Sequence, residues 1–221
     1  MNTTKITFFA CVFATLLPFL GCSKPEATNP PASQPGSEAA TTTPRAEPPT
    51  YPAEIATTQP FAEIASIPGI VEAENFDAGI PNIAYADVDA ENLGAKDHRD
   101  DTQVDIEKRD DASGGYGVGW TRKGEWLVYT VNVEQAGNYK IEIPVASEKL
   151  GGTFHLEFDG QDVTGPIQVP DTGGWGTLQT ITTSGVPLKQ GQQTMKIVMD
   201  TEGVSGSIGD IDHLKFLLED N

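Results

Sequence analysis

The chain has 221 residues, with 32 acidic against 14 basic side chains and a formal charge of −18. Nucleic-acid binding needs a basic surface that releases counterions from phosphates, so this charge argues against a nucleic-acid partner. Two cysteines are too few for the several disulfides of a small secreted scaffold, or for a four-ligand zinc site. Apolar residues make up 38% of the sequence, which is enough for a folded core.

Residues 1–21 have the pattern of an export signal. A short basic start precedes an apolar run over residues 6–20, which is shorter than the ~20 residues that span a membrane. The run ends at Cys22 in a tetrapeptide that resembles a bacterial lipobox, although Phe19 and Leu20 depart from the usual leucine and small residue. We expect a lipoprotein signal peptide and lipidation of Cys22. An ordinary secreted protein with an incidental cysteine is the alternative.

This pattern predicts an exported, membrane-anchored lipoprotein of the outer membrane or cell surface. Cys11 would leave with the signal peptide and Cys22 would be acylated, so the mature protein would contain neither a free thiol nor a disulfide.

Residues 22–66 are rich in Pro, Ala and Thr. Repeated proline removes backbone donors and prevents helix or sheet propagation, and the scattered apolar residues offer little surface to bury. We expect a disordered tether here, although Tyr51, Ile55, Phe61 and Ile64 near its end could dock on the domain.

The remaining residues, 67–221, are enough for one domain. The signal segment contributes +1 and the tether −3, so this domain carries −16 of the total charge of −18.

The domain consists of short strand-like segments separated by turn residues. The segments are rich in β-branched and aromatic residues or alternate between apolar and polar, and none shows a sustained helical period. This predicts an all-β fold, an antiparallel β-sandwich or jelly roll. The strand candidates are residues 70–74, 126–133, 139–143, 153–158, 195–199 and 213–217.

A series of short fragments in the domain resembles, in the right order, a carbohydrate-binding module of family 6 over residues 67–218. The resemblance implies a β-jelly-roll that binds glycans without catalysis and holds a structural calcium ion. The fragments are Glu-Ala-Glu-Asn-Phe at 72–76, Val-Asp-Ile-Glu at 104–107, Val-Gly-Trp-Thr at 118–121, Gly-Glu-Trp-Leu-Val-Tyr-Thr at 124–130, Ala-Gly-Asn-Tyr at 136–139, Gly-Gly-Trp at 173–175 and Asp-Ile-Asp-His-Leu at 210–214.

Trp120 and Trp175 are the candidate sugar-stacking residues. A pyranose ring packs a face of C–H bonds on an aromatic plane, and glycines beside both tryptophans give a ligand close access. Core positions are the alternative, since tryptophan is highly buried on average. By resemblance the two align with the aromatic pair of the family. Trp126, inside a clear strand segment, is expected in the core.

Asp210 occupies the position where the family usually has an asparagine that hydrogen-bonds the sugar. A carboxylate only accepts, so this departure predicts a different hydroxyl geometry or a weaker site. Glu91 and Asn92 are further candidates for polar contacts, in a region that also contains Tyr85 and Asp87. Solvated loop residues are the alternative for this region.

Glu72 and Glu74 stand two apart in a strand segment, so both would point to one face and repel unless a cation lies between them. By resemblance, Asp212 and the backbone carbonyl of Arg99 complete a structural Ca²⁺ site. A solvated acidic edge strand is the alternative.

The expected function is non-catalytic binding of a neutral plant, algal or microbial β-glycan by a monomer at the bacterial surface. The acidic domain disfavours polyanionic ligands. No pair of carboxylates stands out as a glycosidase pair, so a small glycoside hydrolase is an alternative, as is a calcium-dependent adhesion or scaffold lipoprotein.

Overall fold

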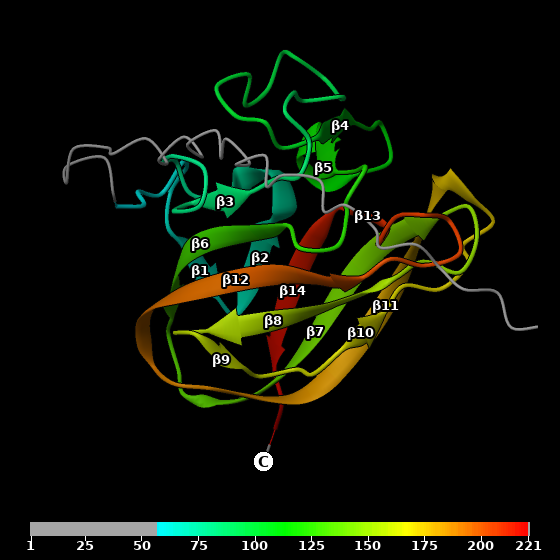
Figure 1. The fold of residues 1–221 in the computed structure, drawn as a ribbon. Coiled ribbons are helices and arrows are strands. Elements are labelled where there is room, and N and C mark those ends of the chain that lie inside the picture. Colours follow the sequence, from blue (N-terminus) through cyan, green and yellow to red (C-terminus); the bar gives the residue numbers. More distant parts are fainter. Residues whose placement is uncertain (1–56, 221) are drawn as a thin grey trace, which may run out of the picture. The chain divides into compact units, whose positions relative to one another are not determined.

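The alternating segments form two sheets whose inner faces enclose one core (Figure 1). This computed structural model describes residues 57–220; the predicted signal peptide, Cys22 and the tether up to residue 56 lie outside the described residues. In β8 (Thr153–Phe158), Phe154, Leu156 and Phe158 are buried, and the residues between them are partly exposed. Burial of alternate residues is what a strand with one core-facing side requires.

The first sheet has the order β1-β6-β12-β8-β10, with β3 added to β6 and β9 to β8. Its pairs are antiparallel except for β1 on β6. The strands are β1 (Ala65–Ile67), β3 (Tyr85–Ala86), β6 (Trp126–Val133), β9 (Gln161–Asp162), β10 (Ile167–Gln168) and β12 (Gly191–Thr201), together with β8.

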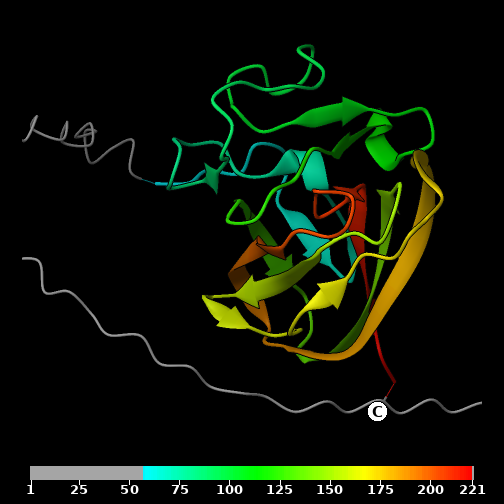
Figure 2. The same cartoon turned by 45° about the vertical axis from the view of Figure 1, so that its right-hand side comes forward.

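The second sheet has the order β2-β14-β7-β13-β5-β4, and β11 pairs with β7. Figure 2 shows β11 as a long ribbon along one side of the sandwich. The strands are β2 (Gly69–Glu72), β4 (Ile106–Lys108), β5 (Tyr116–Val118), β7 (Gly137–Ser147), β11 (Gly174–Leu188), β13 (Asp210–Ile211) and β14 (His213–Leu218); 3-10 helices cover Ala73–Asn75 and Ser113–Gly115. The predicted all-β sandwich is confirmed.

The ordered domain begins before residue 67. Ala65–Ile67 forms β1 and pairs with β6, although residues 57–66 read as tether in the sequence. Upstream of β1, the ring of Phe61 lies 4.0 Å from the guanidinium carbon of Arg99, and the Phe76 ring lies 3.8 Å from it. The cation is therefore held between two rings, one of which belongs to the predicted tether.

One row of paired residues crosses four strands of the second sheet. Ile106 pairs with Val118, Val118 with Ile211, and Ile211 with Val145. All four side chains are buried in the core. Because side chains alternate along a strand, the neighbours of these residues point to the opposite face of the sheet. The pairing of this row therefore fixes which side chains of β4, β5 and β13 lie together on the outer face of the sheet. These strands lie at the upper end of the sandwich in Figure 1.

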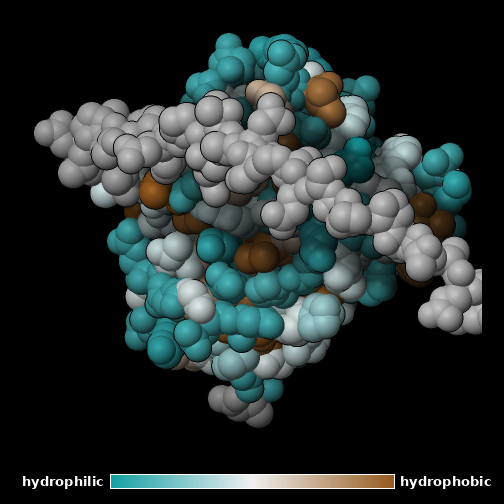
Figure 3. All heavy atoms as spheres, in the orientation of Figure 1, coloured by the Kyte–Doolittle hydropathy of each residue, from teal (hydrophilic) through white to brown (hydrophobic). Residues whose placement is uncertain are grey.

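The face shown in Figure 3 is mostly hydrophilic, with hydrophobic side chains in small separate spots. Within the described range, no helix is long and apolar enough to cross a membrane.

A chain that begins at Ile67 should be less stable than one that begins at Thr57. The shorter chain lacks most of β1 and Phe61, whose contact with Arg99 alone is worth about 0.5–2 kcal/mol. Urea unfolding of the two chains measures the difference. Equal midpoints would show that residues 57–66 do not contribute to the fold.

Candidate functional site

Trp120 lies in the loop after β5, with its backbone in the left-handed region at φ 49°. This conformation costs a non-glycine residue about 1–2 kcal/mol, so the surrounding contacts must hold it. The next residue, Thr121, is buried, and its hydroxyl donates to the carbonyl of Gly209 and accepts from the Gly209 N–H. These bonds fix the loop against the segment that precedes β13, and the indole remains 41% exposed.

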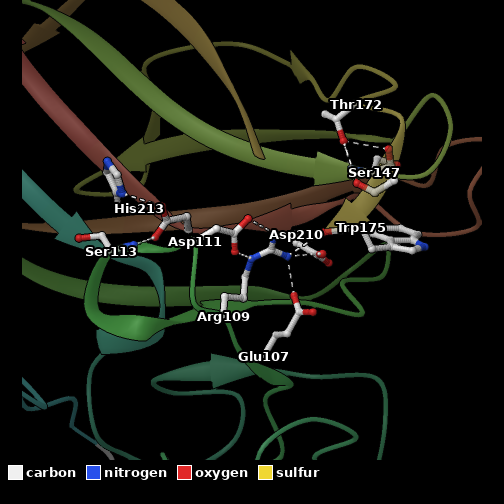
Figure 4. A network of polar contacts seen from close by, with 11 residues as sticks. Glu107, Arg109, Asp111, Ser113, Ser147, Thr172, Trp175, Asp210 and His213 are labelled. Atoms are coloured by element: carbon white, nitrogen blue, oxygen red, sulfur yellow. Dashed lines mark hydrogen bonds and ion pairs between the residues drawn. The ribbon is translucent and has the colours of Figure 1, made fainter. Parts of the chain in front are cut away.

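Trp175 lies near the start of β11, after two glycines with positive φ. Thr172 secures this turn, because its hydroxyl donates to the carbonyls of Ser147 and Gly174, and accepts from the Ser147 N–H. Nη1 of Arg109 donates to the Trp175 carbonyl at 2.8 Å. Figure 4 shows both anchors.

The two tryptophans line one open pocket with a volume of about 390 Å³. Its other lining residues are polar or small, and they come from β4, β13 and two loops. They are Glu107, Arg122, Ser205, Gly206, Ser207 and Asp210. An aromatic pair with hydroxyl, carboxylate and guanidinium groups around it matches a ligand with both C–H faces and hydroxyls.

Asp210 lies at the inner end of the pocket and is 5% exposed. Its carboxylate accepts from Nη1 of Arg109 at 3.3 Å, and the same nitrogen donates to Glu107 at 2.8 Å. Burial and then the Glu107 carboxylate raise the pKa of Asp210, and the Arg109 charge opposes that rise. The aspartate that replaces the expected asparagine is thus accompanied by a buried cation.

Two glycines in and beside β5 make these contacts possible. A Cβ on Gly119 would lie 3.2 Å from Oδ1 of Asp210, and a Cβ on Gly117 would lie 3.5 Å from Cδ of Arg109. With no side chain on the intervening strand, residues from β4 reach across it to β13.

The structure brings together three of the predicted sugar-binding residues, Trp120, Trp175 and Asp210. Glu91 and Asn92 are not among the residues that line the pocket. Asn92 is buried instead, and its side chain binds its own loop through the Gly94 N–H and the Ala95 carbonyl. Glu91 is exposed.

Sequence reasoning missed Glu107, Arg122, Ser205 and Ser207 as pocket residues. Glu107 ends the Val-Asp-Ile-Glu fragment at 104–107, and this membership of a family-like fragment was the available signal.

The expectation that Trp126 belongs to the core is wrong. Its indole is half-buried on the outer face of the first sheet, where Nζ of Lys196 lies 4.6 Å from the ring centroid. The core-facing neighbour in β6 is Leu127, so alternation along the strand directs Trp126 outward.

Glu72, Glu74 and Asp212 converge in a second group near the pocket, the carboxylate cluster. Ligand atoms of Glu72, Asp212 and His213 all lie within 4.8 Å of one another. Glu74 lies beside them, but on the 3-10 helix Ala73–Asn75, so the prediction that both glutamates share a strand face is wrong. The turn at residues 113–115 covers the cluster: Ser113 donates its N–H to Asp212 and its hydroxyl to Glu72.

The donor set of the carboxylate cluster fits a hard cation. Oε2 of Glu72 and of Glu74 are buried without a hydrogen-bond partner in the described residues. Burial, together with the charges of Glu72 and Asp212, raises the pKa of Glu74 to about 8. Three carboxylates that repel one another, two of them with a buried oxygen that accepts no hydrogen bond from the described residues, are the arrangement that Ca²⁺ stabilises with oxygen ligands.

The backbone carbonyl of Arg99, the fourth ligand that the resemblance implies, has partners in its own loop. That oxygen accepts from the N–H and the hydroxyl of Thr102. The side chain of Arg99 instead donates to backbone carbonyls at residues 74, 76 and 77. The loop that lies against the carboxylates is Ser113–Gly115.

The family model "Carbohydrate binding module (family 6)" matches residues 94–217, more than half of the chain. The chain therefore belongs to this family of non-catalytic binding modules. Among solved structures, a β-1,3-glucan-binding family 6 module from Bacillus halodurans is 25% identical with a TM-score of 0.52. A family 6 module of Cellvibrio mixtus lichenase 5A, in complex with cellotriose, is 25% identical with a TM-score of 0.50. Each comparison covers 70% of this chain and 98% of the other.

These neighbours are jelly rolls, which confirms the predicted fold class. Among characterised proteins, the clotting factor G alpha subunit of Tachypleus tridentatus is 38% identical over 91 residues, 40% of this chain and 14% of that protein. β-Agarase AgaA of Microbulbifer thermotolerans is 35% identical over 69 residues, 31% of this chain and 16% of the agarase. The chain thus matches a small part of each relative, and one relative is a glycoside hydrolase.

Trp120→Gly should leave the domain folded, with its free energy of unfolding within about 1 kcal/mol of the native value. Glycine adopts the left-handed backbone without strain, and this gain offsets the packing that a partly exposed ring provides. Trp126→Gly is the matched control and should cost at least about 2 kcal/mol, because the site is half-buried inside β6. Denaturant unfolding compares the two. A larger destabilisation for Trp120→Gly would assign that indole a core role.

Proposed function

We propose that the chain binds a neutral β-glycan in the pocket between Trp120 and Trp175. The observation that carries this proposal is the convergence of two indoles from distant parts of the sequence on one open cavity with polar groups at its inner end. Family membership supports glycan binding in general.

The pocket residues divide the recognition of a sugar between them. The two indoles pack against C–H faces of the ring, where one aromatic contact is worth about 0.5–1.5 kcal/mol beyond the buried area. Glu107 and Asp210 accept hydrogen bonds from hydroxyls, and so can the oxygens of Ser205 and Ser207, whose own protons go to the carbonyls of Ser207 and Thr121. The Arg122 guanidinium donates and makes up for the amide that Asp210 lacks.

The choice of ligands to test follows from charge and from the relatives. A chain of net charge −18 disfavours polyanions such as alginate or pectate. Matched modules bind β-1,3-glucan or hold cellotriose, and one relative is an agarase. Laminarin, mixed-linkage β-glucan, xylan and agarose are therefore the first candidates.

Affinity electrophoresis of residues 57–221 through gels that contain each polysaccharide tests the proposal. At least one neutral glycan should retard the native protein. Trp120→Gly and Trp175→Ala should each weaken retardation at least about tenfold, because each removes one wall of the pocket. Trp126→Phe is the control and should migrate as the native protein does.

Absence of retardation in every gel, with the protein folded, would refute the glycan proposal. Release of reducing sugars over hours would instead indicate a hydrolase.

We further propose that the carboxylate cluster holds a structural Ca²⁺ ion, with Glu72, Glu74 and Asp212 as side-chain ligands. The ion would neutralise the repelling carboxylates and join β2 to the segment between β13 and β14.

Removal of calcium should lower the melting temperature. A ligand at a concentration of 100 times its Kd raises the free energy of unfolding by about 2.7 kcal/mol. A chelator should therefore lower the free energy of unfolding by about this amount. Glu74→Gln should lose most of this stabilisation and be no less stable than the native protein under chelation, because it removes a repelling charge. Melting with calcium and with chelator measures both. A native midpoint that chelator leaves unchanged would contradict the proposal.

We also propose that export and lipidation at Cys22 place a monomeric module at the bacterial surface. Cys22→Ala should shift the full-length protein from the membrane to the soluble fraction. Retention of this variant in washed membranes would show that another feature anchors the chain.

A further inference from the structure

Arg109 is a buried cation behind the pocket, with its side chain 3% exposed. It follows β4, and its contacts reach four other places in the chain: Glu107, Asp111, Asp210 and the carbonyl of Trp175. Figure 4 shows the guanidinium at the centre of this group. Arg109 is not among the residues that line the pocket.

The guanidinium of Arg109 binds Asp111 on one side and Glu107, Asp210 and the Trp175 carbonyl on the other. Nε and Nη2 each lie 3.0 Å from an oxygen of the Asp111 carboxylate, a bidentate pair that sets the plane of the fork. Nη1 then donates to Glu107 at 2.8 Å, to the Trp175 carbonyl at 2.8 Å and to Asp210 at 3.3 Å. A lysine has one charged nitrogen and cannot reproduce this geometry.

The backbone around Trp175 needs an external anchor. The β11–β7 ladder pairs Gly174 with Ser147 and resumes at Gln179 with Val145, so residues 175–178 have no β7 partner in the register. Glycines at 173, 174 and 176 add conformational freedom. Thr172 holds the carbonyl of Gly174, and Arg109 holds the next carbonyl, that of Trp175 itself.

We propose that Arg109 is the positioning residue of the pocket: through one buried fork it fixes the Trp175 wall relative to Asp210 and Glu107. The expected effect of Arg109 on glycan affinity rests on the proposed glycan-binding function. The expected effect of Arg109 on the position of Trp175 does not. The spacing between an aromatic wall and the hydroxyl-binding carboxylates decides which sugar fits, so Arg109 determines specificity without contact with the ligand.

The test combines glycan affinity with the indole N–H signals of the free protein in a ¹H–¹⁵N NMR spectrum. The three tryptophans of the sequence give three indole signals, which single substitutions assign. Arg109→Lys should weaken glycan binding about tenfold, the effect of one hydrogen bond to a charged group. It should also shift or broaden the Trp175 signal without ligand, and leave the Trp126 signal in place.

Asp111→Asn is a milder variant that keeps the experiment decisive if Arg109→Lys does not fold. The Asp111 side chain is 46% exposed. Removal of its charge weakens the bidentate pair that it forms with Nε and Nη2 of Arg109. We expect binding about threefold weaker and a perturbed Trp175 signal. Asp110→Asn is the matched control: this exposed neighbour has no hydrogen bond or ion pair to Arg109 and should behave as the native protein does.

A folded Arg109→Lys variant with native affinity and a native Trp175 signal would overturn the proposal, as would an Asp111→Asn variant indistinguishable from Asp110→Asn. If the native protein bound no glycan, the proposed function would fail, and the Trp175 signal of the free variants would still decide whether Arg109 positions that residue.

Discussion

The antiparallel register of β4, β5 and β13 is the constraint on which the rest of the site depends. The buried row Ile106–Val118–Ile211 leaves the neighbours of these residues on the outer face of the sheet. There β5 and the residue after it present only glycines, Gly117 and Gly119, so side chains from the flanking segments meet above them. A single hydrophobic register thus places Glu107, Arg109 and Asp210 together, and a shift by one residue would turn them all into the core.

The same two segments extend from the pocket to the carboxylate cluster. The first contains Arg109 and then Ser113, and the second contains Asp210 and then Asp212. At one end a cation of the protein balances the carboxylates, whereas at the other end the carboxylates repel one another, and one oxygen each of Glu72 and Glu74 is buried without a hydrogen-bond partner in the described residues. This difference in charge balance explains why one group is suited to a hydroxyl-rich ligand and the other to a metal ion.

Local alternation and β-rich composition predicted the sandwich and six of its strands, β2, β6, β7, β8, β12 and β14. Both pocket tryptophans were predicted from the family resemblance together with their glycine flanks. The sequence did not predict β11, which is rich in threonine and glycine, nor the contact of Phe61 with Arg99, which depends on tertiary packing. The prediction that Glu74 lies in a strand was wrong, because the strand ends at Glu72 and a 3-10 helix follows. The hydrogen bond from Arg109 to the Trp175 carbonyl joins residues far apart in the chain. Such a contact cannot be predicted from the spacing of residues in the sequence.

The most direct test of the glycan pocket is an NMR titration of the tryptophan indole signals with a soluble oligosaccharide of the polysaccharide that binds best. We predict saturable shifts of the Trp120 and Trp175 signals at one common dissociation constant, with the Trp126 signal unmoved. A saturable shift confined to Trp126, on the outer face of the first sheet, would place the sugar elsewhere and contradict the proposed pocket.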